Sequence, residues 1–310
     1  MTPTFSNANN ASVTSSTPTA AVVERVRELV QGAPVAPAYR AALAAALALP
    51  GNILSDAPDT RWARLVWICC TATGGYWVQA VSPAASVELF MVALDVLDDE
   101  EDGERSPLQD NLGAACALNV STGLLLLAQQ GLLAVDRGAV AVRVLLGAGL
   151  GACSGQHADL STTAEQCASL DEAVAVTAEK SASLVAAICQ LGALCAGADI
   201  TLQELYGCFG RHLGMVAQLT NDLAAIRPDA VGKTDVARRR PTLPLAYQAR
   251  CAAGADRGHG KADGALWTGG AAYLTWAVAE AYRRQALALV PALAAGKSGR
   301  ADLTALLHVL

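Results

Sequence analysis

The sequence is poor in aromatic and charged residues, and each shortage excludes a class of protein. Aromatic residues make up 5% of the 310 residues and charged residues 16%, whereas hydrophobic residues make up 53%. The net charge of -6 and the lack of a basic stripe argue against nucleic acid as a partner. A chain of this length and hydrophobic content can bury a large core, as one large domain or two small ones.

Paired cysteines and a targeting segment are also missing. The 9 cysteines include no Cys-x-x-Cys pair, and their odd number indicates reduced, buried thiols in a cytoplasmic protein. Residues 1–20 are rich in Ser, Thr, Asn and Pro, which predicts a disordered tail rather than a secretory signal. The apolar runs 139–153 and 181–198 each contain a polar residue, so we expect no integral membrane segment.

Apolar residues recur at helical spacing along nearly the whole chain, and no alternating run favours a sheet. Breaks rich in Gly and Pro separate helical stretches of about 15 to 30 residues, longer than the average globular helix. Several stretches are apolar around most of their circumference, which is typical of the central helices of a bundle. We therefore predict one all-α domain over residues 21–310, built as a single large helical bundle.

A dense acidic cluster follows the apolar run 87–94. On a helix, Asp98 and Asp102 share one face, Asp95 lies one turn earlier, and such like charges repel. Carboxylates suit Mg²⁺, which usually completes its shell with water and phosphate oxygens, so we expect a phosphorylated substrate. The cluster is equally compatible with a solvated helix end that stops at residues 103–107.

A second group of oxygen ligands and cations lies further along the chain. It contains Gln218, Asn221, Asp222, Asp229, Lys233, Arg238, Arg239 and Arg240, and Lys180 stands alone in an earlier apolar stretch. Carboxylates that hold Mg²⁺, beside cations that hold phosphate oxygens, suit a diphosphate. A helix end followed by a basic loop, with Lys180 as a surface lysine, is the alternative. Together the two groups predict a central cavity that binds a diphosphate and surrounds its hydrocarbon with apolar walls.

Short motifs occur in a fixed order between about residues 59 and 290. They are Asp98-Asp-Glu-Glu-Asp102, Asn119-Val-Ser-Thr-Gly-Leu-Leu, Gly155-Gln-His-Ala-Asp159-Leu160, Lys180-Ser-Ala, the stretch 209–222, Lys233-Thr-Asp235 and Arg240-Pro-Thr-Leu-Pro244. In this order the sequence resembles the trans-isoprenyl diphosphate synthases and their class I isoprenoid synthase relatives. The resemblance implies an all-α fold with a central cavity, a homodimer, and an allylic isoprenyl diphosphate substrate.

The same resemblance implies roles for individual residues. The implied metal ligands, for three Mg²⁺ ions, are Asp98, Asp99, Asp102, Asn221, Asp222 and Asp229. Lys180, Gln218 and Lys233 would join them in catalysis, and the implied substrate-binding residues are Phe90, Ala93, Leu94, Arg105, Gln156, Asp159, Arg239 and Arg240. In the family, the positions of Ala93 and Leu94 help form the cavity floor. The small Ala93 leaves room for a substrate of about 15 to 20 carbons.

Departures from the family motifs decide the expected reaction. Chain-elongating members bind isopentenyl diphosphate with a GKRxRP motif, where this chain has Asp59-Thr-Arg61-Trp-Ala-Arg64, and Arg105 replaces a pair of arginines. Because lost cations weaken a second diphosphate pocket, we expect Mg²⁺-dependent ionisation that leads to a terpene product. The alternative is a prenyltransferase, which elongates an isoprenoid chain or prenylates a non-isoprenoid acceptor as pheromone-prenylating enzymes do. A regulatory subunit of a heteromeric prenyl synthase is the third possibility.

Overall fold

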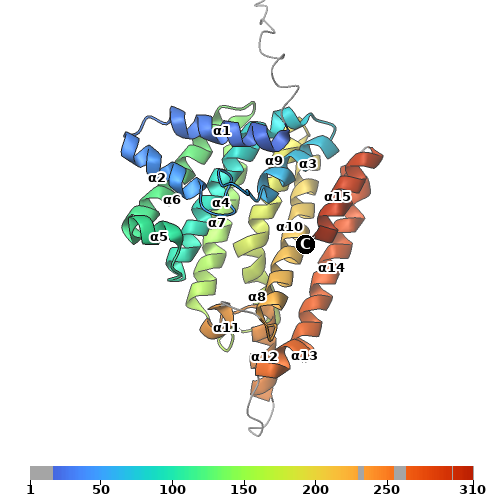
Figure 1. Cartoon of the computed structure of the whole chain (residues 1–310). Coiled ribbons are helices and arrows are strands. Elements are labelled where there is room, and N and C mark those ends of the chain that lie inside the picture. The colour runs from blue at the N-terminus through green and yellow to red at the C-terminus, as the bar shows by residue number, and fades with distance from the viewer. Residues whose placement is uncertain (1–16, 230–233, 255–262, 295, 310) are drawn as a thin grey trace, which may run out of the picture. The chain divides into compact units, whose positions relative to one another are not determined.

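The computed structural model describes residues 17–229, 234–254, 263–294 and 296–309, and these residues form helices and no strand (Figure 1). The prediction of an all-α fold is confirmed. The described residues form two compact units: unit 1 contains 17–67 together with 76–136, and unit 2 contains 68–75 together with the described residues from 137 onward. Each unit is described by itself, and the single domain over 21–310 stays a prediction.

Unit 1 is built around the long helix α4. Its elements are α1 (Pro18–Gly32), α2 (Pro37–Leu47), the first part of α3 (Arg61–Ala72), the 3-10 turn η2 (Trp77–Ala80), α4 (Val81–Glu101), α5 (Pro107–Leu112) and α6 (Ala114–Leu133). Helix α4 packs against α6 and α1, and α2 packs against α6. Every residue of α4 from 83 to 93 is buried, so this helix is the core of the unit.

Helix α1 begins inside the predicted tail. The Thr17 hydroxyl accepts a hydrogen bond from the Ala20 amide at 3.3 Å, and Pro18 occupies the first helical position. A capping hydroxyl and an early proline both favour a helix start. Residues 18–20 are therefore helical, because these two local signals outweigh the polar composition. The rest of the predicted tail, 1–16, lies outside the described residues.

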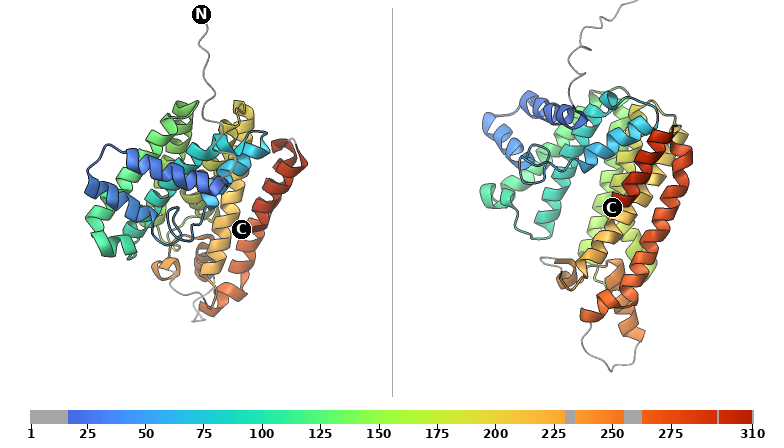
Figure 2. Two further views of the ribbon diagram at one scale, coloured as in Figure 1. Left: turned by 45° about the horizontal axis from the view of Figure 1, so that its top comes forward. Right: turned by 45° about the vertical axis from the view of Figure 1, so that its right-hand side comes forward.

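Unit 2 is a bundle in which α9, α10 and α14 run side by side (Figures 1 and 2). Its elements are α7 (Gly138–Ser161), α8 (Leu170–Thr177), η3 (Ala178–Ala182), α9 (Ser183–Cys195), α10 (Ile200–Ala225), α11 (Thr234–Arg238), α12 (Leu243–Gly254), α13 (Asp263–Thr268), α14 (Gly270–Leu293) and α15 (Lys297–Val309). Tyr206 and Phe209 of α10 are fully buried, and the Tyr206 hydroxyl donates to the Leu293 carbonyl at 3.1 Å. Such a polar tip needs a partner when its ring is buried.

The segment η3 is one turn of π-helix between α8 and α9. Helix α7 crosses it so closely that a Cβ on Gly155 would lie 2.2 Å from the Lys180 amide nitrogen. Glycine is required at this crossing because any side chain would overlap the backbone. Since single π turns often mark functional sites, the position of Lys180 in η3 is notable.

Within the part of the chain that the structure describes, four stretches of helix are long and apolar enough to cross a membrane by length and composition alone: Trp77–Glu101, Ala114–Leu133, Gly138–Ser161 and Leu170–Cys195. In Trp77–Glu101, 72% of the most apolar window is buried inside the protein, as expected of a core helix. In Gly138–Ser161, 28% of the corresponding window is buried. The absence of an integral membrane segment stays a prediction.

Candidate functional site

The acidic cluster occupies the C-terminal end of α4. Helix α4 runs to Glu101, and the backbone amide of Asp102 still donates to the Asp98 carbonyl at 2.8 Å, so both residues lie on consecutive turns of one helix. This confirms the predicted shared face. Carboxylates at this end oppose the helix dipole as well as each other. Helix α4 therefore concentrates negative charge at its C-terminal end, where these carboxylates repel one another and the helix dipole unless a cation is bound.

Burial and mutual repulsion both shift the pKa values of two carboxyl groups in the cluster. Partial burial, followed by repulsion from Glu104 and Asp98, raises the pKa of the half-buried Asp99. Desolvation of its carboxyl group, followed by the charges of Asp98 and Asp99, raises the pKa of Asp95 to about 6, although the residue as a whole is exposed to solvent. A divalent cation would relieve this repulsion.

The donor chemistry of the cluster fits magnesium shared with a phosphate. Among the described residues, no three His, Cys, Asp or Glu side chains already converge on one metal position. Magnesium does not need such a cage, because it is commonly held by one or two carboxylates together with water and phosphate oxygens. The predicted ligands Asp98, Asp99 and Asp102 could therefore hold the ion once a diphosphate is bound.

The predicted cavity-floor residues differ in their exposure. Phe90 and Ala93 are buried in the core of unit 1, and the Ala93 carbonyl accepts a hydrogen bond from the Ser121 hydroxyl at 2.8 Å. Leu94 is only half-buried. Of the three, Leu94 is thus the side chain that a ligand could contact without displacing the core.

Enlarging the predicted floor tests its role. We expect Leu94→Phe to lower turnover of geranylgeranyl diphosphate relative to geranyl diphosphate, because the ring would shorten the space for the hydrocarbon. Ala93→Phe should instead destabilise the protein by about 1–3 kcal/mol, because Ala93 is fully buried. Substrate competition and thermal melting measure the two effects. An unchanged chain-length preference in a folded Leu94→Phe protein would reject the floor assignment.

Arg105 forms an exposed ion pair just after the cluster. Its guanidinium donates to Asp110 Oδ1 from Nε at 3.1 Å and from Nη2 at 2.7 Å, and the two side chains are 83% and 52% exposed. Exposed pairs contribute about 0–1 kcal/mol, so Arg105 could exchange Asp110 for a substrate phosphate. Its predicted substrate role remains a prediction.

Glu88 is a buried carboxylate that sequence reasoning missed as a site residue. It is 2% exposed in the middle of α4, and its Oε1 accepts a hydrogen bond from the Ala63 amide of α3 at 2.7 Å. Burial raises the pKa of Glu88 from 4.5 to about 7, and the Ala63 bond offsets part of that rise. An isolated glutamate inside the apolar run 87–94 was the available signal, because such a residue needs a buried partner.

The raised pKa of Glu88 predicts a pH dependence of stability. The folded protein holds the Glu88 proton more tightly than the unfolded chain does. The contribution of this proton to the free energy of unfolding is therefore full below about pH 4.5 and is lost as the pH rises through about 7. The loss amounts to about 3 kcal/mol. Urea unfolding in EDTA between pH 5 and pH 8 should show a smaller fall for Glu88→Gln than for wild type. If the free energy of unfolding has the same pH dependence in wild type and in Glu88→Gln, the predicted contribution of Glu88 is wrong.

In unit 2, Asp159 of α7 connects two predicted phosphate-binding cations. Lys180 Nζ lies 3.0 Å from Asp159 Oδ2, and Arg240 Nη1 donates to the Asp159 carbonyl at 3.0 Å. Asp159 and Arg240 are buried, and Lys180 is 29% exposed. The structure therefore brings together three residues that are far apart in the sequence, and their shared role stays a prediction.

A second set of contacts, made of hydrogen bonds, connects η3, which contains Lys180, to α10. The Ser181 hydroxyl donates to Gln218 Oε1 at 3.1 Å, and Gln218 Nε2 donates to Asp222 Oδ1 at 3.0 Å. Asp222 is 3% exposed, whereas its neighbour Asn221 is exposed. Gln218 is thus fixed from both sides, which suits a residue that orients a ligand.

The remaining predicted residues of unit 2 lie in different surroundings. Asp229 lies beyond the end of α10 at Ala225, and its carboxylate accepts two hydrogen bonds of 2.9 Å from Arg227. Arg239 is exposed, has a left-handed φ of 57° and pairs with Glu165. Gln156 is half-buried on α7, and Lys233 lies outside the described residues. The structure thus favours Arg240 over Arg239 as the partner of Asp159.

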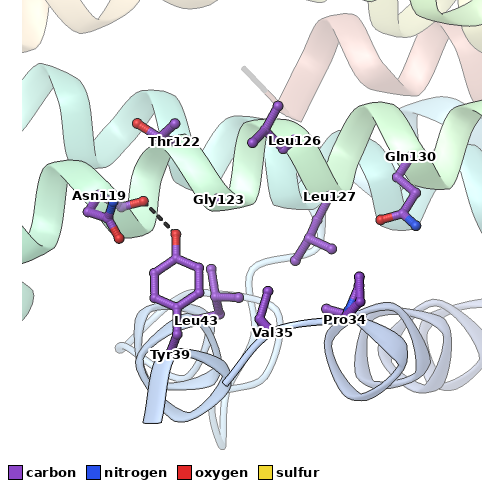
Figure 3. Close-up of a pocket in the computed structure, with 11 residues that line it drawn as sticks. Pro34, Val35, Tyr39, Leu43, Asn119, Thr122, Gly123, Leu126, Leu127 and Gln130 are labelled. Atoms are coloured by element: carbon purple, nitrogen blue, oxygen red, sulfur yellow. Dashed lines mark hydrogen bonds between the residues drawn. The ribbon is translucent and has the colours of Figure 1, made fainter. Parts of the chain in front are cut away.

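A separate groove lies between α2 and α6 in unit 1 (Figure 3). Its volume is about 370 Å³, its walls include Val35, Leu43 and Leu127, and the Tyr39 hydroxyl donates to the Asn119 carbonyl at 2.7 Å. No residue predicted to bind metal or substrate lines it. The groove is therefore distinct from both acidic motifs.

The comparison with protein families decides the classification. The model of the polyprenyl synthetase family matches residues 63–260. The chain belongs to this family. The match includes both acidic motifs and the lysine segment, so the family recognition made from sequence motifs is confirmed.

Curated relatives of this polyprenyl synthetase family member include two kinds of enzyme. The (2E,6E)-farnesyl diphosphate synthase of Mycobacterium tuberculosis is 34% identical over 195 residues, which cover 59% of this chain and 54% of the relative. The tryptophan prenyltransferase ComQ of Bacillus spizizenii is 28% identical over 163 residues, which cover 52% of this chain and 55% of the relative. The chain thus spans about half the length of the curated relatives it matches.

Solved structures confirm the fold. A polyprenyl synthetase from Streptomyces coelicolor A3(2) superposes with a TM-score of 0.77 at 24% identity, covering 94% of this chain and 97% of its own. The all-α class I isoprenoid synthase fold is therefore confirmed. The expected terpene product finds no support among the relatives, whose names favour the alternative, prenyl transfer.

Proposed function

We propose that this protein is a magnesium-dependent prenyltransferase that uses an allylic isoprenyl diphosphate of about 15 to 20 carbons. The acidic cluster at the end of α4 is the observation that supports this most strongly, because one helix holds Asp98 and Asp102 on consecutive turns, where their like charges favour a bound cation. The family and the names of the relatives support prenyl diphosphate chemistry.

The residues of each unit would have different tasks in ionisation. Asp98, Asp99 and Asp102 would hold Mg²⁺, as Asp222 and Asn221 would in the second motif, with three ions in all as the family resemblance implies. Bound Mg²⁺ would neutralise charge on the departing diphosphate. Lys180 would donate hydrogen bonds to the diphosphate, and Asp159 holds this lysine in place at 3.0 Å until then. Preplaced cations of this kind stabilise a charge as it develops.

A homodimer is part of the proposal. Helix α6 exposes Leu118, Leu126 and Leu133, and α7 exposes Leu146 and Leu150, so each helix presents apolar side chains that a second copy could cover. Light scattering on a sizing column measures the mass in solution. We also propose a cytoplasmic location, since the cysteines of the described residues are free thiols.

One product assay tests the proposed reaction. The protein and Mg²⁺ are incubated with geranyl, farnesyl or geranylgeranyl diphosphate, alone, with isopentenyl diphosphate, or with an indole-bearing peptide. Transfer predicts diphosphate release together with a longer isoprenoid or a prenylated peptide. A hydrocarbon or alcohol formed equally well without any acceptor would contradict transfer and favour terpene formation. No diphosphate release under any condition would contradict catalysis and favour a regulatory subunit.

A further inference from the structure

Three large aromatic side chains are exposed where α13 leads into α14, and we call them the aromatic patch. Tyr273 is 71% exposed, Trp276 is 54% exposed and Trp267 is 38% exposed. The rings of Tyr273 and Trp276 lie beside each other, with centroids 6.1 Å apart and planes tilted by 36°. The whole chain has only 5 Trp and 6 Tyr residues. Exposed apolar residues are ordinary when they are scattered, so three large rings in one short stretch indicate an interaction surface.

The first turns of α14 present this patch on the side that faces away from the core of unit 2. On the other side, Ala271 and Thr275 are buried, and Ala271 belongs to one buried cluster with Ile226 at the end of α10. Tyr273 and Trp276 are one turn apart, so they share the outer side of the helix. The outer side of a surface helix usually carries charged and polar residues. Here it carries two rings that the chain itself does not cover.

A cation lies beside the third ring of the patch. The Arg227 guanidinium carbon, Cζ, is 5.7 Å from the centroid of the Trp267 ring, which connects the end of α10 to α13. Arg227 also pairs with Asp229 at 2.9 Å, and these two side chains are 51% and 70% exposed. An exposed pair of this kind contributes little to stability. Arg227 can therefore exchange the Asp229 carboxylate for an external anion, and a guanidinium is well suited to a phosphate group.

The stretch of sequence around the patch differs in charge from the rest of the chain. Residues 226–284 contain 10 Lys and Arg and 5 Asp and Glu, a net charge of +5, whereas the whole chain has a net charge of -6. The rest of the chain is therefore strongly acidic. In this stretch, α12, α13 and the start of α14 lie side by side at one end of the bundle (Figures 1 and 2). A basic and aromatic end on an acidic protein is complementary to an anionic surface.

We infer that the aromatic patch and Arg227 dock this end of unit 2 on a membrane surface that contains anionic phospholipids. Trp and Tyr concentrate at membrane–water interfaces, because their rings are apolar while their N–H and O–H groups stay hydrated. Arg227 pairs with a headgroup phosphate beside the Trp267 ring. A peptide partner matches the patch less well, since peptides are usually held in a groove or at a sheet edge, whereas these rings project from the outer side of a helix.

Docking of this end brings the second acidic motif close to the membrane. Asp222 precedes Arg227 by little more than one turn near the end of α10, within unit 2. The proposed substrate is an amphiphile, and its hydrocarbon chain partitions into a bilayer. The docked protein therefore takes such a substrate directly from the membrane surface. This consequence rests on the proposed function, whereas the docking itself does not.

Flotation of the full-length protein with vesicles tests the docking without turnover. The vesicles contain phosphatidylcholine alone or an equal mixture of phosphatidylcholine and phosphatidylglycerol. Wild type should float with the anionic vesicles at low salt and be released from them at high salt, because salt screens the attraction. Trp276→Ala should weaken this binding about tenfold, through the loss of a buried ring, and Arg227→Gln about fivefold, through the loss of one cation near the surface.

Two residues of unit 1 provide matched controls. Tyr76 is 78% exposed, and Arg27 is 56% exposed in an ion pair, as Arg227 is, so Tyr76→Ala and Arg27→Gln should bind vesicles as wild type does. Absence of wild-type binding, or equal binding by Trp276→Ala and Tyr76→Ala, would overturn the inference. Binding to an acidic peptide or to RNA without binding to vesicles would also overturn it. Vesicle binding by a protein that releases no diphosphate would reject the proposed function and leave the docking intact.

Discussion

Asparagine at Asp98 or Asp102 is expected to lower diphosphate release by about a thousandfold. Each change removes one negative oxygen donor from the end of α4 and keeps the shape of the side chain. A bound metal contributes several kcal/mol to stabilising charge on a leaving group, and about 4 kcal/mol corresponds to a thousandfold in rate. Steady-state release of diphosphate from farnesyl diphosphate, at saturating Mg²⁺, measures the loss.

The stability of the same variants separates a metal role from a structural one. Asp98 and Asp102 repel each other across one helical turn, so either asparagine should leave the melting temperature in EDTA unchanged or slightly raised. Mg²⁺ with diphosphate should raise the melting temperature of wild type and not of the variants. Asp56→Asn, an identical change on an exposed loop of unit 1, is the control. Wild-type turnover in either variant would reject the metal site.

Gly155→Ala is expected to destabilise the protein by about 3 kcal/mol. The added Cβ would lie 2.2 Å from the Lys180 nitrogen and 2.7 Å from its Cα, and backbone atoms cannot move aside as a flexible side chain can. The π turn would be displaced, and Lys180 with it. Turnover should therefore fall in those molecules that remain folded, and both thermal melting and diphosphate release should report the change.

Helix α7 offers a matched control for this prediction. Gly147 lies on the same helix and is exposed, with no atom within 4 Å of the position of an added Cβ. Gly147→Ala should stabilise the helix by up to about 1 kcal/mol, because alanine is the better helix former. If Gly155→Ala melts at the same temperature as Gly147→Ala, the close crossing of α7 and η3 does not occur in solution.

The fold class could be predicted because the helical period is local and repeated. The helix boundaries are harder to predict. Helix α1 begins at Pro18 because the Thr17 hydroxyl caps it, and this single side chain is easily overlooked in a tail of polar composition. The separation of the chain into two compact units has no sequence signal of this kind. It depends on contacts between distant helices, which no local pattern specifies.

The candidate site shows the same limit. The spacing of Asp98 and Asp102 predicts their shared face, because one helix carries both residues. The contact between Asp159 and Lys180, by contrast, depends on how α7 crosses η3, and only the family resemblance pointed to it. The sequence shows Glu88 as a charged residue inside an apolar run. Its partner could not be predicted, because Ala63 contributes a backbone amide, and every residue except proline has one.

The fate of the two halves of the substrate tests the central claim most directly. Farnesyl diphosphate labelled in both the prenyl chain and the diphosphate is mixed with the protein, Mg²⁺ and an acceptor, and samples are quenched in time. Prenyl transfer predicts that free diphosphate and prenylated acceptor appear at the same rate, and that both vanish when EDTA replaces Mg²⁺. Both labels remaining together in farnesyl diphosphate, with every acceptor class supplied, would contradict the account.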